Sequence, residues 1–164
     1  MKSLLKKYAD YNIWAHQRLF EQINKLNEIQ IHTTVESSFN NIHKTLLHLL
    51  DAENIWWQRV KLVEQIVIPS QACNDNFIEV QNKLLLQSKQ WQAWVSNANE
   101  LQLKHVFAFK DKKNDWVKMP ISEMLLHLFN HGTYHRGQLV TMLRQLGCTN
   151  IPQTDFSFYC RQLK

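Results

Sequence analysis

The sequence predicts an all-α fold, a four-helix bundle with a small β-hairpin before its last long helix. The chain has 164 residues, 45% of them hydrophobic, which is enough for one globular domain over residues 1–164. It contains only 3 Gly and 3 Pro, too few for a turn-rich all-β fold or a disordered chain. Its apolar residues recur mainly at the 3.6-residue period of amphipathic helices. Four helices of about 20 residues, with connections long enough for crossovers, give a bundle whose core faces can also hold a metal.

The N-terminal part of the chain predicts two long helices. Apolar positions within residues 3–25 fall mostly on one helical face, which predicts the first helix. Ser37 or Ser38 is the expected N-cap of the second helix, whose apolar positions continue through Val63 before Pro69 ends it. Both segments therefore present an apolar face for packing.

The middle of the chain predicts a third helix and then a hairpin. Asn74 or Asp75 is the expected N-cap of a helix over residues 77–96, which carries an apolar and aromatic seam. The next segment has a different period, because apolar residues at 106–109 and 116–117 flank a polar stretch. Strand, polar turn and strand is the simplest interpretation, so we expect a small hairpin here.

The C-terminal part predicts the fourth long helix and a packed tail. Pro120 is tolerated in a first helical turn, and apolar residues from Met124 onward repeat at helical spacing up to Gly147, the expected stop. Residues 148–164 contain an aromatic cluster. The tail is therefore expected to pack back onto the bundle.

The distribution of charge argues against a nucleic-acid partner. The 19 basic and 14 acidic residues give a formal charge of +5, which would suit nucleic acid, acidic lipid or a small anionic substrate. However, basic residues come at most in pairs, such as Lys6-Lys7 and Lys112-Lys113, and no zinc-finger or RNP-type motif is present. We therefore expect an ordinary solvated surface and no binding to nucleic acid.

The hydropathy and the cysteines favour a cytoplasmic protein. No window approaches the roughly 18 apolar residues of a membrane span, and charges break the N-terminal apolar run that a signal peptide would need. No membrane partner is therefore expected. Cys73, Cys148 and Cys160 are odd in number and widely spaced, which indicates reduced structural thiols rather than a disulfide framework or a CxxC metal site.

The histidines are the most informative residues. Among the 8 histidines, His127, His131 and His135 form two overlapping pairs at spacing i, i+4. Residues four apart lie on one face of a helix with Cβ atoms about 6 Å apart, within reach of one metal ion. All three cannot share one ion, because His127 and His135 are separated by about 12 Å of helical rise.

A catalytic site of the zinc type needs a third ligand from a neighbouring helix. His48 is the best candidate, because it lies near the middle of the second predicted helix among leucines, whereas His16, His32, His43 and His105 have weaker arguments for convergence. For each histidine the alternative is a hydrogen-bonded core residue without metal. A metalloprotease of the HExxH type is excluded, because Gly132 stands where that motif has its glutamate.

Several segments are similar to the DinB/YfiT-like metalloenzymes, a family usually seen with a helix carrying NHxxxHRGQ followed by LLxxLG. The similar segments cover nearly the whole chain in order: DYNIWAHQRL (10–19), NIHKTLLHLLDAENIWWQR (41–59), LLHLFNHGTYHRGQLVTMLRQLG (125–147) and PQTDFSFYCR (152–161). Two positions depart from the family pattern. His16 stands where Asn is more frequent, and Tyr134 stands where a second His is frequent, so both can reshape the pocket.

The resemblance implies an up-down-down-up four-helix bundle with a three-histidine site on the second and fourth helices. Carried over residue by residue, it assigns the metal ligands to His48, His131 and His135, the set that geometry also favours. His127 is left as a core residue or one that orients a neighbouring group through its ring N–H. No cofactor other than the metal is expected to be bound by dedicated residues.

The resemblance also implies a class of chemistry. Three neutral imidazoles leave a divalent metal its full positive charge, which lowers the pKa of a bound water or thiol. Zinc or nickel is the predicted metal among those that imidazole suits. Relatives in the wider superfamily include thiol-dependent transferases and isomerases. The implied function is therefore a metal-dependent hydrolase or low-molecular-weight-thiol transferase acting on a small-molecule substrate, with the thiol as cosubstrate.

Two other classes of function stand beside this one. A non-catalytic metal-binding or stress-response bundle would act as a binding module, although no proposed ligand is lost here. DNA binding is suggested by the positive charge and by a family name that refers to damage induction, and it predicts steeply salt-dependent affinity for duplex. Relatives often pair through helix faces, so a homodimer is implied as well, although no sustained heptad marks an interface.

No general acid or base is identified among the residues near the predicted ligands. Asp51 and Glu53 follow His48 on the same helix, where each could orient a ligand, shuttle a proton, stay solvated or bind Arg59. Arg136 could meet an anionic substrate or form a structural ion pair. Gln138 could line the pocket or lie on the surface. The catalytic residues are therefore left open.

Overall fold

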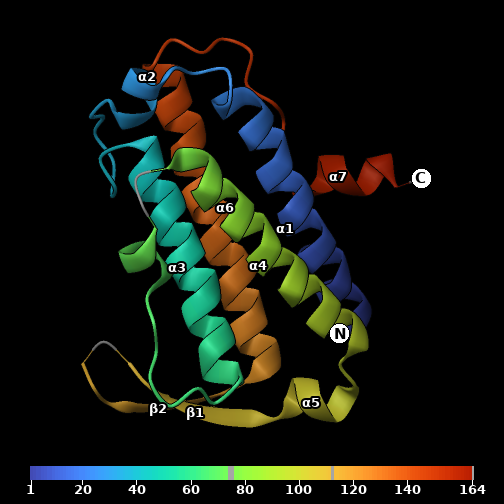
Figure 1. The fold of residues 1–164 in the computed structure, drawn as a ribbon. Coiled ribbons are helices and arrows are strands. Elements are labelled where there is room, and N and C mark those ends of the chain that lie inside the picture. Colours follow the sequence, from blue (N-terminus) through green and yellow to red (C-terminus); the bar gives the residue numbers. More distant parts are fainter. Residues whose placement is uncertain (74–75, 112, 164) are drawn as a thin grey trace.

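The computed structural model, which describes residues 1–73, 76–111 and 113–163, is a four-helix bundle (Figure 1). Its long helices are α1 (Lys2–Ile23), α3 (Ile42–Val60), α4 (Phe77–Asn97) and α6 (Ile121–Gln145). In Figure 1, α1 and α6 run upward and α3 and α4 run downward. Helices α1 and α3 each pack against both α4 and α6. The predicted all-α class and the up-down-down-up order are therefore confirmed.

Shorter elements connect the long helices. They are α2 (Glu28–His32), a 3₁₀ turn η1 (Pro69–Ala72), α5 (Glu100–Lys104), β1 (Val106–Lys110), β2 (Trp116–Pro120) and α7 (Phe156–Gln162). Strands β1 and β2 are antiparallel, with Phe107 opposite Met119. The hairpin predicted before the last long helix is therefore confirmed, and it lies beneath the lower end of the bundle in Figure 1.

The boundaries of α3 differ from the prediction at both ends. The N-cap is Asn41, not Ser37 or Ser38, because the extended backbone of Asn41 lets its side chain accept a hydrogen bond from the Lys44 amide at 2.8 Å. The helix ends at Val60 instead of continuing through Val63. Leu62 adopts a left-handed backbone with φ of 55°, and the Val63 amide donates to the Gln58 carbonyl, which closes the helix in a Schellman-type turn.

The other two predicted caps have different outcomes. Asn74 and Asp75 lie outside the described residues, and the side chain of Asn76 accepts from the Glu79 amide at the start of α4. Helix α6 ends two residues before Gly147, whose φ of 85° is left-handed. That conformation favours glycine, so the predicted stop is confirmed.

The core of the bundle consists of two apolar halves separated by polar side chains. Examples of the first half are Leu19, Ile42, Leu84 and Leu139, and examples of the second are Leu5, Trp91, Val95 and Leu125. Between them lies a set that we call the polar layer, with side chains from all four long helices: Asn12, His16, Glu53, Ser88 and Arg136. Each member is at most 3% exposed. Buried polar groups cost free energy unless they are hydrogen-bonded or lie beside an opposite charge.

The C-terminal tail packs against α1, as expected. The Tyr11 hydroxyl donates a hydrogen bond to the Thr154 carbonyl at 2.7 Å. The ring of Phe156 stacks on Tyr8 with centroids 4.3 Å apart. The three cysteines form no disulfide.

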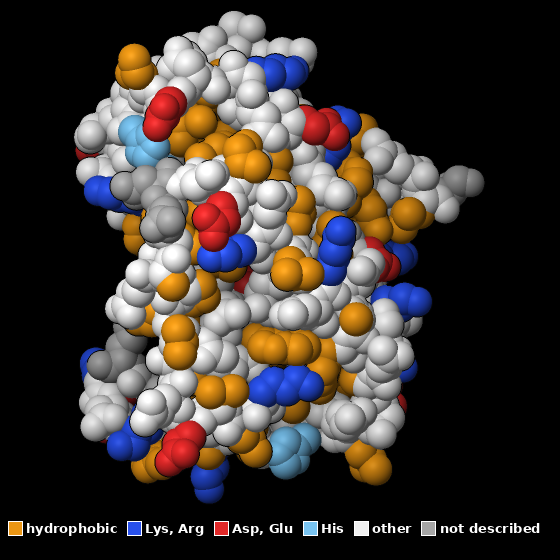
Figure 2. All heavy atoms as spheres, viewed as in Figure 1, with side chains coloured by type: hydrophobic (Ala, Val, Ile, Leu, Met, Phe, Trp, Pro, Cys, Tyr) orange, Lys and Arg blue, Asp and Glu red, His pale blue; other side chains and the backbone are white. Residues whose placement is uncertain are grey.

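Charge is dispersed over the face of the molecule that Figure 2 draws. On the face drawn in Figure 2, Lys and Arg side chains alternate with acidic and apolar ones and form no continuous basic stripe. Within the described residues, none of the helices has both the length and the apolar character needed to span a lipid bilayer.

Candidate metal centre

Three histidines converge where α3 meets α6. His48 Nε2 lies 3.1 Å from His131 Nε2, and His135 Nε2 lies 3.0 Å from the same atom. One ligand nitrogen from each ring lies within 4.8 Å of the other two. Two nitrogens bound to one ion at about 2.0–2.1 Å are separated by roughly 3 Å at ordinary coordination angles. The geometry of the three rings therefore fits a single ion.

The secondary structure explains this convergence. His131 and His135 are four residues apart on α6, so their side chains project from one face of the helix. Helix α3 runs antiparallel to α6 and packs against it, which brings His48 opposite that face. His48 and His131 are half-buried, whereas His135 is only 4% exposed. The site therefore lies at the edge of the core, with part of it open to solvent.

Gln138 fixes the orientation of the most buried ring. His135 Nδ1 lies 2.7 Å from Gln138 Oε1, and because a carbonyl oxygen only accepts, the proton sits on Nδ1. The bare Nε2 then faces the other two histidines. Burial lowers the pKa of His135, while the hydrogen bond to Gln138 acts in the opposite direction. The ring is therefore held in the neutral form that binds a metal.

The segment between α2 and α3 covers the site. The Phe39 ring stacks on His48 with centroids 4.2 Å apart and lies 5.6 Å from His135. Ser38 Oγ accepts a hydrogen bond from Gln138 Nε2 at 2.8 Å. Neither contact was predictable from the sequence, because no local pattern indicates which loop residues will reach a site formed by distant helices.

The donor set is of a kind that binds divalent transition metals. Neutral imidazole nitrogens suit zinc, nickel, copper and iron. Among the described histidines, cysteines and carboxylates, no other group of three or more meets the same criterion of convergence. These three histidines are therefore the residues that could hold a metal ion.

The remaining histidines lie outside this group. His127 is exposed and its ring contacts Trp56 and His131, with centroids 5.5 Å and 5.9 Å away, so the expectation of a core residue is wrong. Its position one turn before His131 places it at the exposed edge of the helix face. His16 belongs to the polar layer, and the ring of buried His43 packs against that of His32.

The carboxylates that follow His48 are engaged elsewhere. Both oxygens of Asp51 accept hydrogen bonds from Ser70, one from its amide at 2.8 Å and one from its hydroxyl at 2.7 Å. Glu53 is buried in the polar layer. Neither binds Arg59, which donates to the Lys110 carbonyl and packs over the rings of Trp56 and Phe109.

Arg136 and Gln138 are both held by hydrogen bonds to neighbouring side chains. Arg136 is 2% exposed and donates to Asn12 Oδ1 and Thr133 Oγ1. It also lines a cavity of about 260 Å³ together with Tyr8 and Asp155. Gln138 is half-buried beside the metal centre, where it binds His135 and Ser38.

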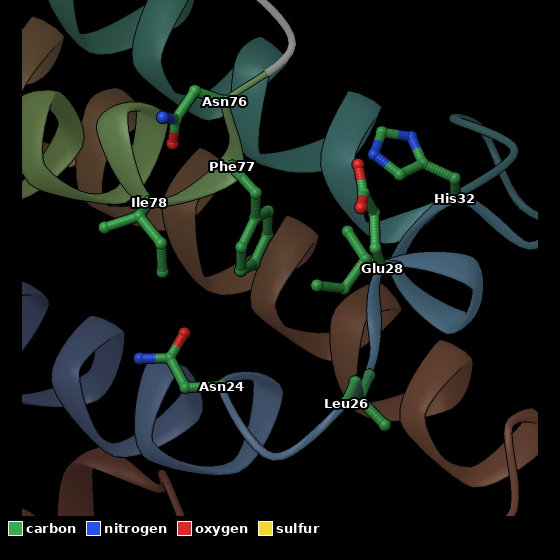
Figure 3. A pocket seen from close by; sticks show the side chains of 8 residues that line it. Asn24, Leu26, Glu28, His32, Asn76, Phe77 and Ile78 are labelled. Carbon is green, nitrogen blue, oxygen red and sulfur yellow. The ribbon is translucent and has the colours of Figure 1, made fainter.

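A separate cavity of about 350 Å³ opens where α1 ends and α4 begins (Figure 3). Glu28 and His32 of α2 lie side by side there, across from Phe77 and Ile78 of α4. The cavity contains none of the three converging histidines. It is therefore distinct from the metal centre.

Comparison with known proteins places the chain among relatives over almost its whole length. The family model described as the DinB family matches residues 1–162. Among curated proteins, Protein DinB of Bacillus subtilis (strain 168) is 28% identical over 168 residues, which cover 97% of this chain and 95% of that protein.

Proposed function

The chain belongs to the DinB family, and on that premise we propose that it is a metal-dependent enzyme acting on a small electrophilic substrate. His48, His131 and His135 hold one divalent ion, zinc or nickel, in this proposal. The observation that carries it is the convergence of three Nε2 atoms, with neighbouring atoms 3.0–3.1 Å apart. Three neutral ligands leave at least one coordination position for a substrate.

The residues around the metal centre favour reaction at a bound ion. A divalent ion bound there would supply Lewis-acid chemistry and lower the pKa of a water or thiol that it contacts. The histidines add no negative charge, so they preserve the charge of the ion. Gln138 keeps the Nε2 lone pair of His135 directed inward. The Phe39 ring covers one side of His48 and excludes water from that side.

Thiol transfer suits these surroundings better than hydrolysis. Asp51 is bound to Ser70 and Glu53 is buried in the polar layer, so neither carboxylate is placed to take a proton from the nucleophile. A thiol in solution is far more acidic than water, so it needs less help from a protein base to ionise. In this reaction the thiol sulfur bonds to the electrophilic carbon, the leaving group departs, and the thiol proton passes to solvent.

Elemental analysis of protein purified without a histidine tag tests the metal site. We expect about one equivalent of zinc or nickel per chain, lost in His48→Ala and in His131→Ala. His105→Ala is the matched control, because His105 is exposed and lies outside the centre. Wild-type protein that binds no metal after incubation with zinc or nickel would contradict the proposal.

An activity measurement separates the classes of function. Zinc-loaded protein is mixed with cysteamine and monobromobimane, an alkylating electrophile, and in parallel with an activated ester. We expect faster thiol alkylation with wild-type and His105→Ala protein and no acceleration with His48→Ala. Ester cleavage without thiol transfer would support the hydrolase instead. Metal binding with neither reaction would indicate a non-catalytic binding module and overturn the enzymatic proposal.

A further inference from the structure

The polar layer lies next to the metal centre on both helices that form it. Arg136 directly follows His135 on α6, and Glu53 lies five residues after His48 on α3, about 7.5 Å along the helix axis. All polar-layer side chains are at most 3% exposed. Any movement of α6 relative to α3 would therefore change both the polar layer and the distances among the three histidines.

Asn12 of α1 connects the two charged members of the polar layer. Its Nδ2 donates to Glu53 Oε1 at 2.8 Å, and its Oδ1 accepts from Arg136. Among the described residues, no ion pair joins Arg136 to Glu53 directly. The amide of Asn12 therefore sits between a buried cation and a buried anion and presents the complementary atom to each.

The remaining contacts fix the Glu53 carboxylate in place. Ser88 Oγ donates to Glu53 Oε2 at 2.8 Å, and His16 Nε2 lies 3.5 Å from Glu53 Oε1. The indole of Trp91 donates to the Glu53 carbonyl at 3.1 Å. Buried charges of this kind are costly to separate from their partners, so each hydrogen bond restricts how the helices can slide.

At Gly132 the backbone of α6 lies directly against Asn12 and the Arg136 side chain. A Cβ atom at Gly132 would lie 3.0 Å from Asn12 Oδ1 and 3.1 Å from an Arg136 terminal nitrogen. Gly132 immediately follows His131, so the ligand-bearing turn of α6 rests against the Asn12 amide. The polar layer therefore contacts α6 within the segment that carries two of the three histidines.

We propose that Asn12 is a positioning residue for the three-histidine centre. By linking Arg136 on α6 to Glu53 on α3, its amide sets the register of these helices and so holds His131 and His135 at the distance from His48 that one ion requires. The proposal rests on the metal site proposed above and adds a residue from a third helix that contributes no ligand.

The test compares zinc affinity in Asn12→Ala with that in Leu84→Ala. Leu84 is fully buried in the first apolar half, so its truncation lowers stability without removing a hydrogen bond of the polar layer. Zinc affinity is measured by competition with a chromogenic chelator, and cobalt absorption reports the geometry of the site. We expect Asn12→Ala to weaken zinc binding by about 10- to 100-fold and to shift the cobalt spectrum. Leu84→Ala should keep wild-type affinity and spectrum.

A second comparison applies if Asn12→Ala does not fold. Gly132→Ala presses a methyl group against Asn12 and Arg136, whereas Gly137→Ala on the same helix meets no atom within 4 Å. We expect weaker zinc binding in Gly132→Ala alone. Equal affinities in the folded variants and wild type would overturn the positioning role and leave the metal site standing. Equal losses in Asn12→Ala and Leu84→Ala would overturn it too, and wild type that binds no zinc would remove both proposals.

Discussion

Gln138 determines which nitrogen of His135 faces the other two histidines, although it is not a ligand itself. Its carbonyl oxygen binds Nδ1 at 2.7 Å, and its amide nitrogen binds Ser38. Replacing it by leucine removes the acceptor and frees the ring to rotate. We expect Gln138→Leu to lower zinc affinity by about 10- to 100-fold, as measured by chelator competition. Gln138→Glu retains an acceptor and should keep most of the affinity. Unchanged binding in Gln138→Leu would exclude this orienting role.

His16 should make the stability of the metal-free protein depend on pH. Burial lowers the pKa of His16 below its ordinary value of 6.5, although Glu53 opposes this shift. As the pH falls below about 6.5, the His16 ring is protonated in the unfolded chain but stays neutral in the folded protein. The free energy of unfolding therefore decreases. One such group contributes a slope of up to about 1.4 kcal/mol per pH unit.

Urea unfolding of metal-free protein between about pH 5 and pH 8 measures this effect. The substitution His16→Asn replaces the titratable ring with a neutral amide, so the variant should lose less stability than wild type on acidification. His135 titrates in both proteins and cancels in the comparison. Parallel pH profiles for the two proteins would show that His16 is not responsible.

Part of the metal centre could be predicted from individual residues and their spacing in the sequence. The i, i+4 spacing of His131 and His135 is a local pattern, so it was sufficient to place both rings on one helical face. The roles of Glu53 and Arg136 were not predicted, because a charged residue gives no local signal of burial. A usable signal was present in α1, where Asn12 and His16 occupy buried positions four residues apart.

At the scale of the element, the N-cap of α3 is a simple determinant of stability. The Asn41 side chain accepts from the Lys44 amide, and Asn41 is 7% exposed. We expect Asn41→Ala to lower the free energy of unfolding by about 1 kcal/mol, because an orphan amide loses its partner. Ser37→Ala is the control, since Ser37 lies outside the cap, and urea unfolding measures both. An equal loss in the two variants would mean that Asn41 does not act as a cap.

Alanine substitutions at two glycines of α6 should change the stability of the protein in opposite directions. Gly137→Ala adds helix propensity in open space and should stabilise the protein by up to about 1 kcal/mol. In Gly132→Ala the new methyl group meets buried atoms that are held by hydrogen bonds, which should cause a net loss of about 1–3 kcal/mol. Thermal unfolding of the metal-free variants measures the difference. Stabilisation by both substitutions would show that the polar-layer side chains move to accommodate the new methyl group at little cost in free energy.

The long helices and the hairpin were predictable from periodicity, whereas the short helices were not. The four bundle helices each have enough turns for an apolar face to be recognised. Helices α2 and α5 have five residues each, too few for a period, yet each begins with a capping box in which Asn is followed three residues later by Gln. The end of α3 was missed because Leu62 adopts a left-handed backbone that residue type does not indicate.

At the scale of the molecule, each long helix runs through both apolar halves and the polar layer. Trp56, Trp57, Trp91 and Trp94 belong to the second half or pack against it, so much of the tryptophan fluorescence reports on that half. Because no long helix belongs to one half alone, we expect fluorescence and far-UV circular dichroism to give the same urea midpoint. Separate midpoints would show that the polar layer divides the bundle into two units.

The arrangement of the whole molecule also explains which contacts of the metal centre could not be predicted from the sequence. The pairing of α3 with α6 followed from the resemblance and from the position of His48 among leucines. Phe39 reaches the site from the segment before α3, and its contact with His48 depends on how that segment folds over two helices. Such contacts arise from tertiary packing and have no periodic signature.

Anomalous diffraction at the zinc edge, from crystals grown with zinc, shows whether one ion is bound by the three histidines. We expect a single strong peak about 2.0–2.1 Å from the Nε2 atoms of His48, His131 and His135. Gln138 should remain bound to Nδ1 of His135. A saturating zinc concentration that gives no peak at this position, or a peak whose ligands do not include His48, would contradict the proposed metal site.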